Sequence, residues 1–212
     1  MLSGSESGIP LDVPTALNRN SPEYKAYLLR KKHLLELEKK KKAELPHLFG
    51  FKHYWWSRVY FESMKRLNYL TAANQMGKSS VQIRKCVHWA TESSMWSKLW
   101  PNREPSMFFY IYPSKPLATR EYHSKWVKEF LPRGSMKDDS QYGWKPEFKN
   151  GEIYAIHFFS GISIYFLTYA MDVDDLQAST PDAIFCDEEP PVKIIPELLM
   201  RLEASKGYWH LC

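Results

Sequence analysis

Cysteine is scarce in this sequence, and the few cysteines are far apart. The 212 residues include three of them, Cys86, Cys186 and Cys212. An odd number at such spacing fits neither a disulfide framework nor a zinc site built from paired cysteines. Cys86 and His88 are two residues apart, but no neighbouring residue completes a metal-binding set. We therefore expect a protein of a reducing compartment, without a metal site of that kind.

Long apolar runs are also lacking. The first ten residues, MLSGSESGIP, are polar and contain no apolar core of a secretion signal. The apolar segments farther along are all too short to span a bilayer. No internal repeat is present. We therefore expect a soluble intracellular protein with no membrane partner, and not a repeat array.

The composition is that of a folded domain with a mildly basic surface. Hydrophobic residues make up 44% of the chain and aromatic residues 15%, which suits one sizeable α/β core. The formal net charge of +5 permits a polyanionic partner without proving one. We expect an N-terminal arm with a basic amphipathic helix over residues 1–45, and the main domain over residues 46–212.

The arm is expected to be loose over residues 1–20 and helical beyond them. Ser21 is a typical N-cap, Pro22 suits the first helical position and Glu23 the first turn. The helix ends in a run of four lysines, 39–42, which is typical either of a solvated face or of a surface that meets DNA or a partner. Its apolar positions form one stripe, made of Tyr24, Tyr27, Leu28, Leu34 and Leu35.

An aromatic cluster precedes the main domain's first strand. Tyr54, Trp55 and Trp56 have ring faces that would stack on an adenine base. The same rings would equally anchor an expected helix over 57–66 on the core, which is the commoner role of such clusters. The sequence leaves both interpretations open.

Strands and helices then alternate, which predicts a mostly parallel sheet with helices on both faces. Residues 132–150 read as a loop, and the alternation on either side of Ser160 and Gly161 predicts a hairpin. The expected strands are 67–73, 106–113, the two arms of the hairpin within 152–169, 182–186 and a last strand from 207, and the expected helices are 77–92, 116–130 and 192–204.

The stretch TAANQMGKSS, residues 71–80, ends as a phosphate-binding loop does. It follows an expected strand and opens an expected helix, where free N–H groups and the helix dipole hold phosphate. Lys78 would reach the terminal phosphates, Ser79 would offer its hydroxyl to Mg²⁺, and Gly77 would let the backbone approach the anion. Ala72 occupies the slot of the first glycine, which a residue at negative φ tolerates. The expected nucleotide-binding residues are Asn74, Gln75, Met76, Gly77, Lys78, Ser79 and Ser80.

A second apolar strand, AIFC, is followed at once by acids. Asp187 would hold Mg²⁺ through its water shell, and Glu188 would act as the general base on the attacking water. Acidic residues at the start of a helix that follows a core strand would give the same sequence pattern. The phosphate loop 109 residues upstream, with the right order of elements between, favours the nucleotide site.

From about Tyr54 to the end, the chain resembles the large subunit of tailed-bacteriophage terminases, the DNA-packaging motor. The stretches that carry the resemblance are NYLTAANQMGKSS, MFFYIYPSK, GISIYFLTYA, LQASTPDAIFCDEEPP, PELLMRL and GYWHL. The resemblance implies an α/β P-loop NTPase fold of the RecA-like (ASCE) type, with ATP and Mg²⁺ as cofactors. It makes Lys78 and Ser79 part of the Walker A motif, Asp187 the Walker B aspartate and Glu188 the hydrolytic glutamate. It places Gln177 near the γ-phosphate.

Two departures from the family pattern matter. Many relatives carry an arginine in the slot that Asn74 occupies, so a stabilising cation is expected from Arg201, from Arg84 or from a neighbouring subunit. Relatives also continue into a longer coupling strand and a nuclease domain. Only Glu197 and Glu203 follow the acidic strand tip here, so we expect the ATPase half alone.

The leading hypothesis is therefore an ATPase motor domain that drives double-stranded DNA into procapsids. The resemblance implies a portal protein and a small terminase subunit as partners, a homo-oligomeric ring on the portal, and a location in the host cytoplasm at the procapsid portal. One alternative is a helicase- or RecA-like NTPase outside packaging. Another is a non-catalytic DNA- or protein-binding module with a vestigial loop, against which the intact Lys78, Ser79, Asp187 and Glu188 argue.

Overall fold

The computed structural model describes residues 21–50, 52, 54–73, 75–170 and 179–212. The chain divides into two compact units, Met1–Lys40 and Lys41–Cys212, and each is described by itself. Expected residues Asn74 and Gln177 lie outside the described ranges.

The described part of the first unit is helical. Helix α1 (Pro22–Glu44) begins as expected, because the Ser21 hydroxyl accepts a hydrogen bond from the Tyr24 amide at 3.1 Å. None of its residues is buried. The expected apolar stripe is divided, since Tyr24, Tyr27 and Leu34 are half-buried while Leu28 and Leu35 are exposed.

The second unit is built on a seven-stranded sheet in the order β1-β7-β6-β2-β5-β4-β3. Pairing is parallel from β1 to β5 along this order and antiparallel for β5-β4 and β4-β3. Strand β7 thus lies between β1, which leads into the phosphate loop, and β6, which ends at the acids. The strands are β1 (Leu67–Tyr69), β2 (Met107–Tyr112), β3 (Trp144–Lys149), β4 (Glu152–Phe158), β5 (Ser163–Thr168), β6 (Ala183–Cys186) and β7 (Tyr208–Leu211).

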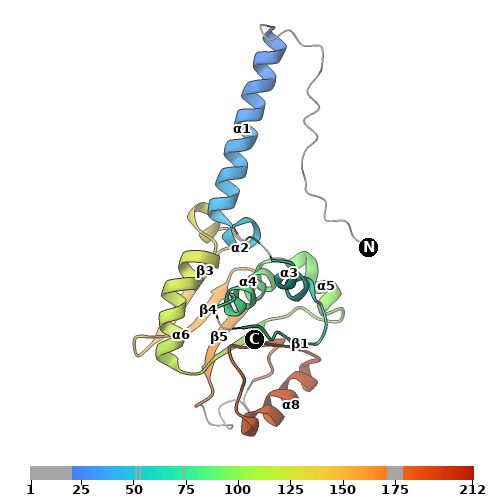
Figure 1. Cartoon of the computed structure of the whole chain (residues 1–212), viewed down its shortest axis with the longest axis vertical. Coiled ribbons are helices and arrows are strands. Elements are labelled where there is room, and N and C mark those ends of the chain that lie inside the picture. Colours follow the sequence, from blue (N-terminus) through green and yellow to red (C-terminus); the bar gives the residue numbers. More distant parts are fainter. Residues whose placement is uncertain (1–20, 51, 53, 74, 171–178) are drawn as a thin grey trace. The chain divides into compact units, whose positions relative to one another are not determined.

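Helices cover both faces of this sheet, as Figure 1 shows for α4 and α8. The α-helices are α2 (Pro46–Phe49), α3 (Trp55–Glu62), α4 (Lys78–Thr91), α5 (Trp96–Leu99), α6 (Lys115–Glu121) and α8 (Ile195–Ser205). The π-helix η2 (Tyr122–Phe130) continues α6 directly. Short 3₁₀ turns are η1 (Ser93–Met95), η3 (Gly134–Lys137) and η4 (Val192–Ile194).

The core forms because successive side chains of a strand point to opposite faces. On β2, Phe108 and Tyr110 join the larger core cluster under α4 and η2, while Phe109 and Ile111 join the cluster under α8. Trp89 of α4 is fully buried in the larger cluster, and its ring meets those of Trp100, Phe185, Tyr208 and His210 edge to face. This packing fixes α4, and hence the loop before it, against the sheet.

The expected hairpin around Gly161 is confirmed, with β4 and β5 antiparallel. The prediction of a loop over 132–150 was wrong for residues 144–149, which form the edge strand β3. Asn150 and Gly151 both have positive φ, 53° and 79°, and this is the tight two-residue turn that joins β3 to β4. Pro146 lies within β3, a position that an edge strand tolerates.

The aromatic cluster at 54–56 is not a core anchor as a whole. Tyr54 is 64% exposed and Trp55 83%. The rings of Tyr54 and Trp56 stack on each other with centroids 6.2 Å apart. Helix α3 begins at Trp55, earlier than the expected start at 57.

Candidate nucleotide site

The segment after β1 has the backbone of an anion-binding loop. Gln75 and Gly77 have positive φ, 64° and 83°, and α4 starts directly after Gly77. A Cβ built on Gly77 would meet no atom within 4 Å, so backbone conformation rather than space favours glycine there. The first amides of α4 have no partner within the helix, and they therefore offer N–H groups to an anion.

The lysine of this loop lies across it. Lys78 Nζ donates a hydrogen bond to the Ala72 carbonyl oxygen at 2.8 Å. Ala72 is the residue in the slot of the usual first glycine. This backbone acceptor holds the ammonium group at the loop, and an anionic oxygen would replace it with a stronger charge-assisted bond.

The loop meets the acidic end of β6 directly. All four residues of β6 are buried, and Asp187 follows them with 8% of its surface exposed. The Ser79 hydroxyl donates to Asp187 Oδ1 at 2.7 Å. Burial raises the pKa of the Asp187 carboxyl above its ordinary value, and the bond from Ser79 opposes that shift. Two of the predicted metal-binding groups are thus in contact.

The next residue has an unusual backbone that neighbouring groups hold. Glu188 has φ 69°, a left-handed conformation that costs a non-glycine residue about 1 kcal/mol or more. Its amide donates to the Cys212 carbonyl at 2.9 Å. The Tyr169 hydroxyl donates to the carbonyl oxygens of Asp187 and Glu188 at 3.0 and 2.6 Å. These bonds fix the turn that presents the Glu188 side chain.

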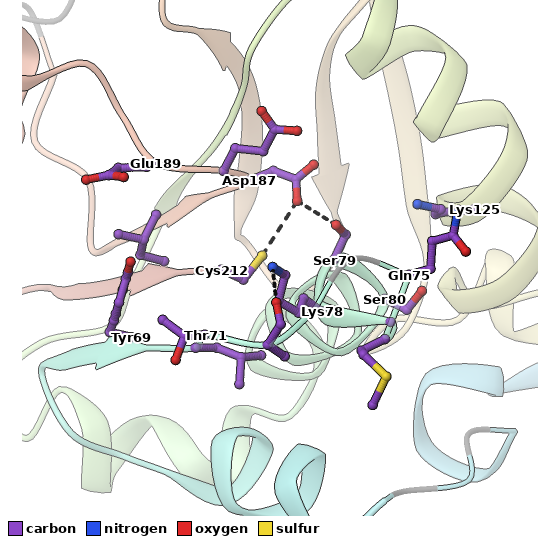
Figure 2. Close-up of a pocket in the computed structure, with 16 residues that line it drawn as sticks. Tyr69, Thr71, Gln75, Lys78, Ser79, Ser80, Lys125, Asp187, Glu189 and Cys212 are labelled. Carbon is purple, nitrogen blue, oxygen red and sulfur yellow. Dashed lines mark hydrogen bonds between the residues drawn. The ribbon is translucent and has the colours of Figure 1, made fainter.

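A cavity of about 740 Å³ joins these groups, and Figure 2 shows the side chains that surround it. Its lining comes from the loop, the start of α4, the acidic turn, the end of β7 and helix η2. The lining residues are Tyr69, Leu70, Thr71, Ala72, Gln75, Met76, Gly77, Lys78, Ser79, Ser80, Lys125, Asp187, Glu188, Glu189, Leu211 and Cys212.

Most of the predicted site residues are brought together here. The cavity lining contains every described residue of the predicted set except two arginines. Gln75, Met76 and Ser80 line it beside the groups already named.

Arg84, one of those two, is turned toward α2. It is buried, and its guanidinium donates to the carbonyl oxygens of His47 and Leu48 and stacks on the Phe61 ring. Burial lowers the pKa of Arg84 to about 10. In this arrangement it joins α2 to α4 and does not contact the cavity.

Arg201 is held on its own helix. Its Nε donates to Glu197 Oε1 at 2.6 Å, one turn earlier in α8. It is not among the residues that line the cavity. A role for Arg201 at a neighbouring subunit's nucleotide stays a prediction.

The sequence prediction missed two residues that line the cavity, Lys125 and Cys212, and one that supports the acidic turn beside it, Tyr169. Lys125 comes from η2, Tyr169 holds the acidic turn, and Cys212 Sγ lies 3.6 Å from Asp187 Oδ1. Tyr169 directly follows β5 and Cys212 directly follows β7, and the carboxyl ends of parallel strands share one edge of the sheet. Lys125 lies farther along the chain, in the helix that follows β2 and α6.

Within the described residues, no group of three His, Cys, Asp or Glu side chains could hold a metal ion. No helix in the described part of the chain is long and apolar enough to cross a membrane.

The sequence matches no protein-family model and no curated protein. Among solved structures, its fold is similar to the ATPase domain of the large terminase of Thermus phage P74-26, with a TM-score of 0.53 and 15% identity. The similarity covers 76% of this chain and 64% of that one, so it spans less than two thirds of the phage domain. This likeness confirms the expected α/β P-loop fold, with its mostly parallel sheet between helices.

Proposed function

We propose that this chain is a P-loop ATPase that binds ATP with Mg²⁺ in the cavity and hydrolyses it. One observation carries the proposal: Ser79 and Asp187 are joined by a hydrogen bond of 2.7 Å in the cavity lining, beside Lys78. In P-loop NTPases a phosphate loop and an acid-tipped strand supply a lysine, a serine or threonine and an aspartate to the nucleotide and its Mg²⁺, and the three groups here are of these types.

The residues present fit a magnesium ion. Mg²⁺ in nucleotide sites takes only one or two oxygens from the protein and the rest from phosphates and water. The Ser79 hydroxyl and the Asp187 carboxylate offer two such oxygens in contact. Bound there, the ion would neutralise phosphate charge.

Residues of the chain would bind the phosphates and accept the proton of the attacking water. Lys78 and the first amides of α4 would bind the phosphates, with Lys78 giving up its bond to the Ala72 carbonyl. The exposed carboxylate of Glu188 would accept a proton from the attacking water. Tyr169 and Cys212 would keep the Glu188 backbone in place while it does so.

We further propose that this ATPase serves DNA packaging, with double-stranded DNA, a portal protein and a small terminase subunit as partners. The motif resemblance to large terminase subunits and the fold likeness to a terminase ATPase domain support this role. The net charge of +5 suits a partner that is a polyanion.

The test is release of phosphate from ATP by the purified chain, measured with Mg²⁺ or EDTA and with or without double-stranded DNA. The proposal expects slow release that requires Mg²⁺ and that DNA accelerates. Release without DNA stimulation would leave the ATPase and remove the support for a DNA motor. No release above that of a Lys78→Met variant would contradict the ATPase itself.

A further inference from the structure

The described lining of the cavity contains two cationic side chains, Lys78 and Lys125. Lys78 belongs to the phosphate loop, whereas Lys125 comes from η2, on a different segment of the chain. The two predicted arginines are not among the described lining residues, and the structure shows Arg84 in contact with α2 and Arg201 in contact with Glu197. Lys125 is therefore the second positive charge that the fold itself supplies to this cavity.

Helix η2 holds Lys125 on a rigid base. The next residue, Trp126, is fully buried, and its indole Nε1 donates to the Tyr112 hydroxyl at 3.0 Å. Tyr122 and Phe130 of the same helix are also buried. A π-helical turn is wider than an α-helical one. Such turns are rare in proteins, and those that occur are often found at functional sites. Figure 2 shows the Lys125 side chain at the cavity, on the side opposite Cys212.

Lys125 has a nearby carboxylate partner. Its Nζ lies 2.5 Å from Oε2 of Glu121, one turn earlier, and this carboxylate is largely buried, with 12% of its side chain exposed. Lys125 lines the same cavity as Ser79 and Asp187, the two groups that meet at the predicted Mg²⁺ site.

We propose that Lys125 is a second phosphate-binding cation that acts within the same chain, and that Glu121 orients it toward the terminal phosphates. This rests on the proposed ATPase function. A lysine acts there as a point charge, and the four-carbon stem allows it to bind a phosphate oxygen while it remains near Glu121. The charge would favour a triphosphate over a diphosphate, because Lys125 acts at the metal end of the site.

The competing explanation is that the pair only stabilises the helix. An i,i+4 pair on a helix surface contributes little to stability, and Lys125 retains 34% side-chain exposure. On that explanation, removing the charge would change the melting temperature slightly and leave nucleotide affinity unchanged. Measurements of nucleotide affinity and of melting temperature therefore distinguish the two roles.

The test is equilibrium binding of fluorescent ATP and ADP analogues, with Mg²⁺, to the full chain. Lys125→Met should weaken ATP binding by about tenfold or more, as expected for a lost bond to a charged group, and ADP binding by less. Lys125→Arg keeps the charge and should retain most of the affinity. Lys128→Met removes an exposed lysine one turn along the same helix and should change neither affinity.

The melting temperature of each variant is measured as well, to establish that the variant is folded. If Lys125→Met binds both nucleotides as Lys128→Met does, while Lys78→Met has lost binding, the assignment of Lys125 is wrong and the ATPase proposal stands. If the parent chain binds neither nucleotide, the proposed function itself fails.

Discussion

The Ser79 hydroxyl donates a hydrogen bond to the Asp187 carboxylate across 108 residues of sequence, at 2.7 Å. One group follows β1 and the other follows β6, and β7 separates these two strands in the sheet. The contact therefore depends on the register of three parallel strands and on the packing of α4. It places two predicted Mg²⁺ ligands side by side.

Ser79→Ala should weaken the binding of Mg²⁺ at the nucleotide site. The variant removes one oxygen from the site and leaves the buried Asp187 carboxylate without the bond that stabilises its charge. We expect the Mg²⁺ concentration for half-maximal ATP binding to rise by about tenfold. A magnesium titration measures it, and Ser79→Thr, which keeps a hydroxyl, is the control. An unchanged titration would show that Ser79 is not a ligand.

Glu188→Gln should keep ATP binding and lose hydrolysis. The amide has nearly the shape of the carboxylate but cannot accept the proton of the attacking water. Loss of a general base typically slows a reaction by about 10²- to 10⁴-fold. Single-turnover rates and binding should be measured on the same preparation. A parental rate would exclude Glu188 as the base, and Glu189, which also lines the cavity, would be the next residue to test.

Tyr169→Phe should slow hydrolysis with little effect on ATP affinity. The hydroxyl donates to two carbonyl oxygens of the acidic turn, and without it the left-handed Glu188 loses part of its support. Each lost bond should lower the free energy of unfolding by about 1 kcal/mol. Urea unfolding and single-turnover rates measure the two effects. Tyr165→Phe is the control, because that ring packs against Tyr154. Equal effects of both variants would contradict a specific role for Tyr169.

The free energy of unfolding should fall as the pH is lowered from 6.5 toward 4. Burial lowers the pKa of His47 to about 3 and that of His88 to about 4, below the ordinary value of 6.5. Between these values the unfolded chain binds more protons than the folded one, so acid favours unfolding. Each histidine adds a slope of up to about 1.4 kcal/mol per pH unit.

Urea unfolding at several pH values across this window measures the slope. His47→Gln should reduce it, while His123→Gln, at an exposed position of η2, should not. A free energy of unfolding that stays constant or rises on acidification would show that these histidines are not held neutral in the folded state.

Local patterns in the sequence predicted the parts of the site that are local in the fold. The phosphate loop and the acidic strand tip each depend on a few consecutive residues, and the hairpin depends on Gly161. Strand β3 was missed because Pro146 and the polar residues around it mask the alternation. The Asn150–Gly151 turn was the signal that should have revealed it.

Lys125 and Tyr169 could not be found in that way. The position of Lys125 at the cavity and that of Tyr169 beside the acidic turn follow from which strands are neighbours in the sheet, and a single sequence does not determine that order. Arg84 shows the opposite case. Its place one turn into α4 predicted a site residue, but the acceptors that hold its guanidinium are carbonyl groups of α2, far away in the sequence.

The most direct test of the central claim is calorimetric binding of ATP with Mg²⁺ to the parent chain and to Lys78→Met. Lys78 is the cation of the phosphate loop, and its ammonium group can exchange its bond to the Ala72 carbonyl oxygen for bonds to phosphate oxygens. We expect the parent chain to bind ATP and Lys78→Met to lose binding by about tenfold or more while it melts at a similar temperature. Lys98→Met, at an exposed position of α5, should bind as the parent does. Equal affinity of the parent and Lys78→Met would contradict the claim that this loop binds a nucleotide.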